Sequence, residues 1–168
     1  MIAVALALMP SFSSLIIVAM TIFELIDAGD ADGLRELLAR DPAAAAQTDE
    51  QGLSVVMRAA YRGLADVVLE AAPPLGPFDR IVVGRSDDLP APDDWTPDGF
   101  TPLHIAAFAN NVAAAESLLA AGADPNVFAT ASFARVTPLG TCRFANADDV
   151  ARILLEHGAD PSLVEQGV

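Results

Sequence analysis

Two histidines, one cysteine and several paired aspartates are the side chains of this 168-residue chain that could do chemistry. His104 and His157 lie far apart in the sequence, so a histidine-rich metal site is not expected. Cys142 is the single cysteine, which excludes an internal disulfide and a cysteine-based zinc site. The chain also lacks the glycine-rich phosphate-binding motifs and the G-x-S-x-G motif of serine hydrolases. We therefore predict that the protein is not an enzyme and uses no cofactor.

The aspartates gather at predicted turns, where a carboxylate can cap the first N–H groups of a helix. The adjacent pairs are Asp87-Asp88, Asp93-Asp94 and Asp148-Asp149. The pairs between residues 85 and 98 could recruit a cation, but their spacing does not resemble an EF-hand loop. We predict solvated caps and no metal site, and an enzyme or metal protein hidden in residues 85–98 stays open as an alternative.

The formal net charge of -14 makes the chain strongly acidic. This charge argues against nucleic acid as a partner, because phosphates are bound by lysine and arginine. It favours a protein partner with a basic surface. The chain is rich in alanine and has no lysine, a composition typical of a GC-rich bacterial genome.

Residues 98–126 contain the elements that would position these side chains. A turn at Asp98-Gly99 precedes Thr101-Pro102, where Thr can cap a helix and Pro suits its first position. We predict one helix from Pro102 to Ala109 and a second from Val112 to Ala120, separated by an asparagine turn. Helices this short are marginal in water, so the unit must stack on copies of itself.

This stretch closely resembles one ankyrin repeat, in which G-x-TPLH-x-AA is followed by a break and then LL-x-x-GAD-x-N. The matching residues are Gly99, Thr101, Pro102, Leu103, His104, Ala106, Ala107, Leu118, Leu119, Gly122, Ala123, Asp124 and Asn126. The resemblance implies an all-α ankyrin-repeat solenoid of helix–turn–helix units with short turn or hairpin fingers. It implies that His104 hydrogen-bonds to the Thr101 hydroxyl as a structural residue. Cys142 falls on a small inner-helix position, which predicts a buried structural thiol.

Copies of the pattern make residues 20–168 a single ankyrin-repeat domain. The repeats are expected at about residues 22–48, 49–76, 77–97, 98–133 and 134–165. The third repeat is degenerate: it keeps an inner helix near Phe78 and Ile81 but loses most of its second helix to Pro90-Ala91-Pro92. An irregular loop is the alternative there. The spacing from Thr101 to Thr137 exceeds the usual 33 residues, which predicts a longer finger at residues 127–136.

Residues 1–19 are apolar and uncharged, and three interpretations stay open. A secretory signal would lack the usual positive start and a clean cleavage site. A membrane anchor has about the right length but is weakened by Pro10 and the serines that follow it. The third interpretation is an artefact upstream of a true start at Met20. We expect a cytoplasmic protein, with membrane anchoring or export through residues 1–19 as the alternative.

In the ankyrin pattern, the residue after each Ala-Ala pair projects from the inner helix into a concave groove. Aromatic residues hold this position in three repeats, and exposed aromatic residues commonly mark partner sites. Packing of these rings against neighbouring repeats is the alternative. The predicted partner-binding residues are Tyr61, Arg62, Asp98, Phe100, Phe108, Phe133, Arg135 and Phe144.

We therefore predict a non-enzymatic protein-interaction module that binds its partner in the concave groove. A membrane-tethered or exported adaptor is one alternative. A self-associating structural protein is another, because no polar capping helix follows the last repeat. Val150 and Ile153 are accordingly expected to be poorly covered at that end.

Overall fold

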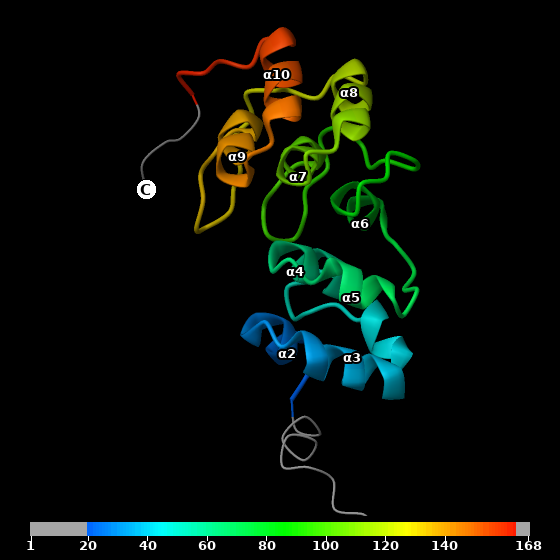
Figure 1. The fold of residues 1–168 in the computed structure, drawn as a ribbon. Helices are drawn as coiled ribbons and strands as arrows, with labels where there is room; N and C mark the ends of the chain where they lie inside the picture. Colours follow the sequence, from blue (N-terminus) through cyan, green and yellow to red (C-terminus); the bar gives the residue numbers. More distant parts are fainter. Residues whose placement is uncertain (1–19, 164–168) are drawn as a thin grey trace, which may run out of the picture.

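The computed structural model describes residues 20–163, in which short helices follow one another as a stack (Figure 1). The N-terminal half contains α2 (Ile22–Ala28), α3 (Ala31–Arg40), the 3-10 helix η1 (Pro42–Ala46), α4 (Val55–Tyr61) and α5 (Ala65–Leu69). The C-terminal half contains α6 (Pro77–Val82), α7 (Pro102–Phe108), α8 (Val112–Ala120), α9 (Pro138–Ala145) and α10 (Asp148–Glu156). The predicted all-α solenoid architecture is confirmed.

The helices form two layers. The inner helices α2, α4, α6, α7 and α9 pack against one another in chain order. In the outer layer, α3 packs against α5, and α8 packs against α10 (Figure 1). Since each inner helix except α6 also packs against the outer helix that follows it, every short helix has neighbours on at least two sides.

Local sequence signals set the ends of these helices. The hydroxyls of Ser54 and Thr137 accept hydrogen bonds from the N–H of the third residue of α4 and of α9, which are Met57 and Gly140. After α7 ends, Asn110 adopts a left-handed conformation with φ of 49°. This residue turns the chain, so that α8 begins two residues later. The second helix of residues 98–126 has the predicted bounds, and the first ends one residue earlier than predicted, at Phe108.

The outer layer has a gap beside α6, because no helix forms between Val82 and Pro102, a stretch that the structure describes completely. The hydrophobic core divides within α4, one inner helix before this gap. One cluster of buried side chains includes Leu25, Leu34 and Val68, and the other runs from Leu53 and Met57 through Ile81 towards the C-terminal end. Val82 is partly buried against both clusters.

The amide of Asn111 bridges α8 and α6. Its Nδ2 donates to the carbonyl oxygens of Ile81 at 3.1 Å and Arg85 at 2.7 Å, while its Oδ1 accepts from the Ala114 N–H at 3.1 Å. Carbonyl groups at a helix end have no partner within the helix, so this buried amide binds one carbonyl group of α6 and one of the segment that follows it, as well as capping α8. The neighbouring Asn110 accepts from the Val150 N–H at 3.2 Å.

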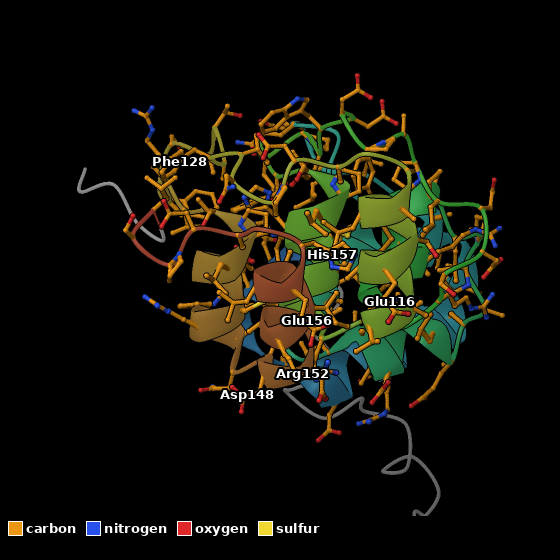
Figure 2. All side chains as sticks on the ribbon, turned by 90° about the horizontal axis from the view of Figure 1, so that it is seen from above. Glu116, Phe128, Asp148, Arg152, Glu156 and His157 are labelled. Carbon is orange, nitrogen blue, oxygen red and sulfur yellow. The ribbon has the colours of Figure 1, made fainter. Side chains whose placement is uncertain are left out.

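The outer side of α10, at the C-terminal end of the stack, is mostly polar apart from the exposed Leu155, contrary to our expectation. Val150 and Ile153 are buried, because the apolar face of α10 turns inward against α8 and α9. Figure 2 looks down on this end, where Asp148, Arg152 and Glu156 mark the outer side of α10. Arg152 and Glu156 form an ion pair of 2.9 Å. The expectation that Val150 and Ile153 are poorly covered was wrong. Self-association through that end was proposed because of this expected apolar surface, so that argument no longer holds.

No helix in residues 20–163 is long and apolar enough to cross a membrane. The three interpretations of residues 1–19 as a signal, an anchor or an artefact fall outside the described part of the chain.

The bridge made by Asn111 leads to a first prediction. Asn111→Asp keeps an oxygen to cap α8 but replaces the two N–H donors by a carboxylate that faces two carbonyl groups. We expect the free energy of unfolding in urea to fall by about 2 kcal/mol. The Ser117→Ala change on the exposed side of α8 is the control and should stay near the wild type. A fully stable Asn111→Asp variant would mean that Asn111 is a helix cap and nothing more.

Candidate functional site

A cavity of about 380 Å³ lies on the side of the stack formed by α4, α7, α9 and the segments that precede α7 and α9. Its walls contain no charged side chain and are mostly aromatic and aliphatic. We call it the aromatic groove, and its lining residues are Tyr61, Phe100, His104, Ile105, Phe108, Phe133, Ala134, Val136, Thr141 and Phe144. A concave apolar surface of this size is suited to holding side chains of a partner or a small ligand.

Helix periodicity and stacking bring these residues together. Ile105 and Phe108 are three positions apart on α7, and Thr141 and Phe144 have the same spacing on α9, so each pair shares one helix face. Tyr61 ends α4, as Phe108 ends α7. Because α4, α7 and α9 follow the same stack, equivalent positions form a stripe. The structure therefore brings together five of the eight predicted partner-binding residues, all of them aromatic.

Three of these rings pack inside the groove wall. The rings of Tyr61 and Phe108 meet edge to face with centroids 5.3 Å apart. Phe100 is only 9% exposed and lies 5.7 Å from the His104 ring and 5.9 Å from the Phe133 ring. We expected Phe100 to project towards a partner, but the ring forms part of the buried wall.

The other two phenylalanines are exposed. Phe133 is 69% accessible and Phe144 is 82% accessible, although both belong to the lining of the groove. Phe133 comes from the connection between α8 and α9, and Phe144 lies in the last turn of α9. Large apolar side chains clustered at the rim of an apolar cavity are a feature of partner-binding surfaces.

Tyr61 and Asp98 form a polar feature at the edge of the groove. Burial is the main reason that the pKa of Tyr61 is raised well above its ordinary value, and the nearby carboxylate of Asp98 adds to the shift. The Tyr61 hydroxyl and Asp98 Oδ1 are both buried, and neither makes a hydrogen bond with another described residue. Asp98 is thus half-buried, with one carboxylate oxygen beside Tyr61, and its contact with a partner stays a prediction.

The two predicted arginines are exposed and lie next to the groove in the chain. Arg62 directly follows Tyr61, and its Nη2 lies 3.7 Å from an oxygen of Asp27. Arg135 lies between the lining residues Ala134 and Val136, with its guanidinium 5.8 Å from the centre of the Phe128 ring. Asp27 pairs more closely with Arg58 at 2.6 Å, and that hydrogen bond lowers the pKa of Asp27.

His104 has the structural role that the sequence predicted. Its Nδ1 lies 2.7 Å from the Thr101 hydroxyl and accepts from the Thr101 N–H at 3.3 Å. Nε2 therefore carries the proton and donates to the Val136 carbonyl at 3.0 Å. The residue is fully buried, and burial lowers the pKa of His104 to about 4. With both nitrogens engaged and the ring neutral, His104 holds the segment before α9 onto α7 and is not placed to act as a general base.

The remaining candidates for chemistry are also accounted for. Cys142 is buried, and burial raises the pKa of its thiol to about 12, so the thiolate needed for nucleophilic attack does not form at neutral pH. Asp87 and Asp88 pair with Arg80. Within residues 20–163 no three histidine, cysteine, aspartate or glutamate side chains come together in a way that could hold a metal ion.

Sequence reasoning missed some residues that shape this region. Ile105 and Thr141 line the groove three positions before Phe108 and Phe144, and the helical period could have found them. Asp79 was also missed: its carboxylate is buried, accepts from the Gly76 N–H at 2.9 Å and binds the Ser54 hydroxyl of the preceding unit. Nothing in the sequence points to that last contact.

Stacked helix pairs with an apolar groove along the inner helices define the class of helical-repeat interaction proteins. Residues 22–129 and 94–165 each match the family model described as ankyrin repeats (3 copies), and together these matches span most of the chain. The protein therefore belongs to the ankyrin-repeat family, and the resemblance recognised from the TPLH motif is confirmed. A comparison with curated proteins found no match.

The lowered pKa of His104 predicts a specific loss of stability in acid. The unfolded chain binds a proton at this histidine near pH 6.5, whereas the folded protein binds it near pH 4. Between these values the unfolded state holds more protons, so the free energy of unfolding falls as the pH is lowered, by about 3 kcal/mol in total.

Urea denaturation at pH values from 7 to 4 measures this slope. His104→Gln should be less stable at pH 7 but should show a much flatter dependence on pH between 6.5 and 4. His157→Gln is the matched control and should keep the wild-type slope. Equal slopes for His104→Gln and the wild type would show that another group controls acid stability.

Proposed function

We propose that this ankyrin-repeat protein is a non-enzymatic interaction module that binds a protein partner in the aromatic groove. Members of the family mediate protein–protein interaction, which supports the general role. The observation that carries the particular site is the convergence of five aromatic side chains, from α4, α7, α9 and two connecting segments, on one uncharged cavity. Two of these rings, Phe133 and Phe144, are largely exposed.

The energetics favour the groove as the anchor of the interface. Aromatic side chains that enter or line a desolvated pocket contribute more to binding than most contacts around them. Burying a largely exposed phenylalanine against a partner removes apolar surface from water, and this is worth up to about 2 kcal/mol per ring. Phe133 and Phe144 can contribute in this way with little cost to the fold, because they are not part of the buried core.

The charge of the surface outside the groove favours a second property of the partner, a basic surface. The net charge of -14 favours partners with basic residues around the docking segment and disfavours nucleic acid. We further propose that no catalytic step is involved and that the protein acts in the cytoplasm.

The groove is tested by affinity capture from the source cells. The double variant Phe133→Ala/Phe144→Ala should lose its partner by at least tenfold, because both anchors are removed. Leu155→Ala is the matched control, since Leu155 is 48% exposed on α10 and lies outside the groove. Circular dichroism should show both variants folded. Capture of the same partners by the double variant and the wild type at equal yield would refute binding in the groove.

The location is tested by fractionating the source cells and sequencing the N-terminus of the native protein. We expect the protein in the soluble cytoplasmic fraction with its first residue at Met20 or Thr21. Recovery with the membranes, with residues 1–19 intact, would instead support the anchored alternative. A shortened protein in an exported fraction would support the signal peptide.

A further inference from the structure

The aromatic groove has two walls that are built in different ways. One wall consists of side chains of the inner helices, among them Tyr61, Phe108 and Phe144. The other includes Phe133, which lies on the connection between α8 and α9; we call residues 127–136 of this connection the finger. The inner helices are held by the buried core, so the width of the groove depends on where the finger lies.

Hydrogen bonds attach the finger at its base. The Ala129 N–H donates to the Val136 carbonyl at 2.8 Å and closes the loop between these two residues. His104 Nε2 donates to the same carbonyl at 3.0 Å, which joins the loop to α7. The Thr130 N–H donates to the Gly99 carbonyl at 2.9 Å. The finger is therefore attached to the turn before α7 as well as to α7 itself.

Gly99 permits this attachment because it lacks a side chain. Its φ is 91°, a left-handed conformation that glycine adopts without steric cost. An ideal Cβ at this position would lie 2.6 Å from the nitrogen of Ala131 and 2.9 Å from the carbonyl carbon of Thr130. Non-bonded carbon atoms pack about 3.5–4.0 Å apart, and both of these neighbours are backbone atoms. A side chain at position 99 would therefore force the finger to move.

Gly52, in the corresponding turn before α4, has the same conformation in a less crowded place. Its φ is 90°, and its N–H donates to the carbonyl three residues earlier at 3.0 Å, as the N–H of Gly99 does. The nearest atom to an ideal Cβ at Gly52 is Cγ of Pro97 at 3.6 Å, an ordinary van der Waals contact. The two glycines thus share a backbone conformation and differ in what packs against them.

The contact at Gly99 also fixes the place of Phe133. Phe100 directly follows Gly99, and its ring lies 5.9 Å from the ring of Phe133 and 5.7 Å from that of His104. Phe100 is buried, so it gives Phe133 a fixed surface to pack on, although Phe133 itself is largely exposed. This ring contact exists only while the finger lies across the turn that contains Gly99.

We propose that Gly99 is a positioning residue of the aromatic groove. By admitting the backbone of the finger to contact distance, Gly99 places Phe133 as the second wall and so sets the size of the apolar group that the groove accepts. The inference rests on the proposed function and adds the residue that determines the shape of the site. A side chain at position 99 displaces the finger, opens the groove and weakens apolar binding while the helices stay stacked.

The test compares Gly99→Ala with Gly52→Ala in the full-length protein. Both changes put a side chain at a φ near 90°, so both lower stability, but only the first collides with backbone atoms. In NMR spectra without ligand, we expect nuclear Overhauser effects between the ring protons of Phe100 and Phe133 in the wild type and in Gly52→Ala. Gly99→Ala should lose them. Their persistence in Gly99→Ala would overturn the proposal.

Binding is measured with N-phenyl-1-naphthylamine, an uncharged aromatic probe whose fluorescence rises in an apolar site. Gly52→Ala should bind the probe as the wild type does, whereas Gly99→Ala should bind about fivefold more weakly, the effect expected when one ring contact is lost. Phe133→Ala/Phe144→Ala should also bind weakly, which places the probe in the groove. Equal dissociation constants for the two glycine variants would refute the role of Gly99.

Amide hydrogen exchange tests the proposal in the wild type, and it decides even when Gly99→Ala does not fold. The N–H groups of Ala129 and Thr130 attach the finger to Val136 and Gly99. They should exchange more slowly when the groove is saturated with the probe, because a ligand held by Phe133 stabilises the attached finger. Unchanged exchange at both groups with the probe bound would contradict the proposal.

The outcomes distinguish this inference from the proposed function. If the phenylalanine double variant loses its protein partner but Gly99→Ala behaves as Gly52→Ala does, the groove is a binding site and the positioning role of Gly99 is refuted. If the wild type does not bind the probe in a way that needs Phe133 and Phe144, the inference is also refuted. Partner capture with the phenylalanine variants then decides separately on the groove.

Discussion

Helices of five to ten residues cannot keep their shape alone in water, so every helix of this protein depends on the repeat beside it. Apolar burial supplies most of this support, but buried polar side chains determine how neighbouring repeats align on one another. His104 binds the carbonyl of Val136 from the next unit, Asp79 binds Ser54 of the previous one, and Asn111 reaches back to α6. A buried polar group without a partner costs free energy, so each of these contacts penalises any slip between neighbouring repeats.

The groove follows from the same repetition. Residues of the TPLH pattern are used to fold and stack each unit, and the position after the Ala-Ala pair is left free to vary. Repetition places that variable position at equivalent sites near the ends of α4, α7 and α9. Aromatic side chains at this position in three repeats therefore form one continuous surface. Arginines appear beside the same positions at α4 and α9. A binding surface can therefore change by substitution at a few positions without disturbing the residues that hold the stack together.

Much of this arrangement could be predicted from the sequence, because the signals are local. Turn residues, the Thr-Pro helix start and the asparagine break predict α7 and α8 to within one residue. What the sequence did not predict depends on contacts between distant segments. Phe100 is buried because the segment containing Phe133 folds across it, and Asp98 turns to Tyr61, which belongs to another repeat. Val150 and Ile153 were misjudged for a different reason: the charged positions of α10 already form a polar outer face, and no extra helix is needed to cover its apolar side.

The two halves of the stack are joined through α6, which has no outer helix beside it. A stack of repeats is held by its unit-to-unit junctions, and a junction with one helix in place of two is the weakest. The two buried clusters meet within α4, where Val55, Val56 and Ala59 belong to the first and Met57 to the second, so they should open as two cooperative units that share this helix. The aromatic groove lies on the second unit, because Tyr61 at the end of α4 packs against the second cluster, but α4 also carries side chains of the first. A ligand that contacts Tyr61 together with Phe108 and Phe144 would span the weak junction, and occupation of the groove would thereby couple the folding of one half to that of the other.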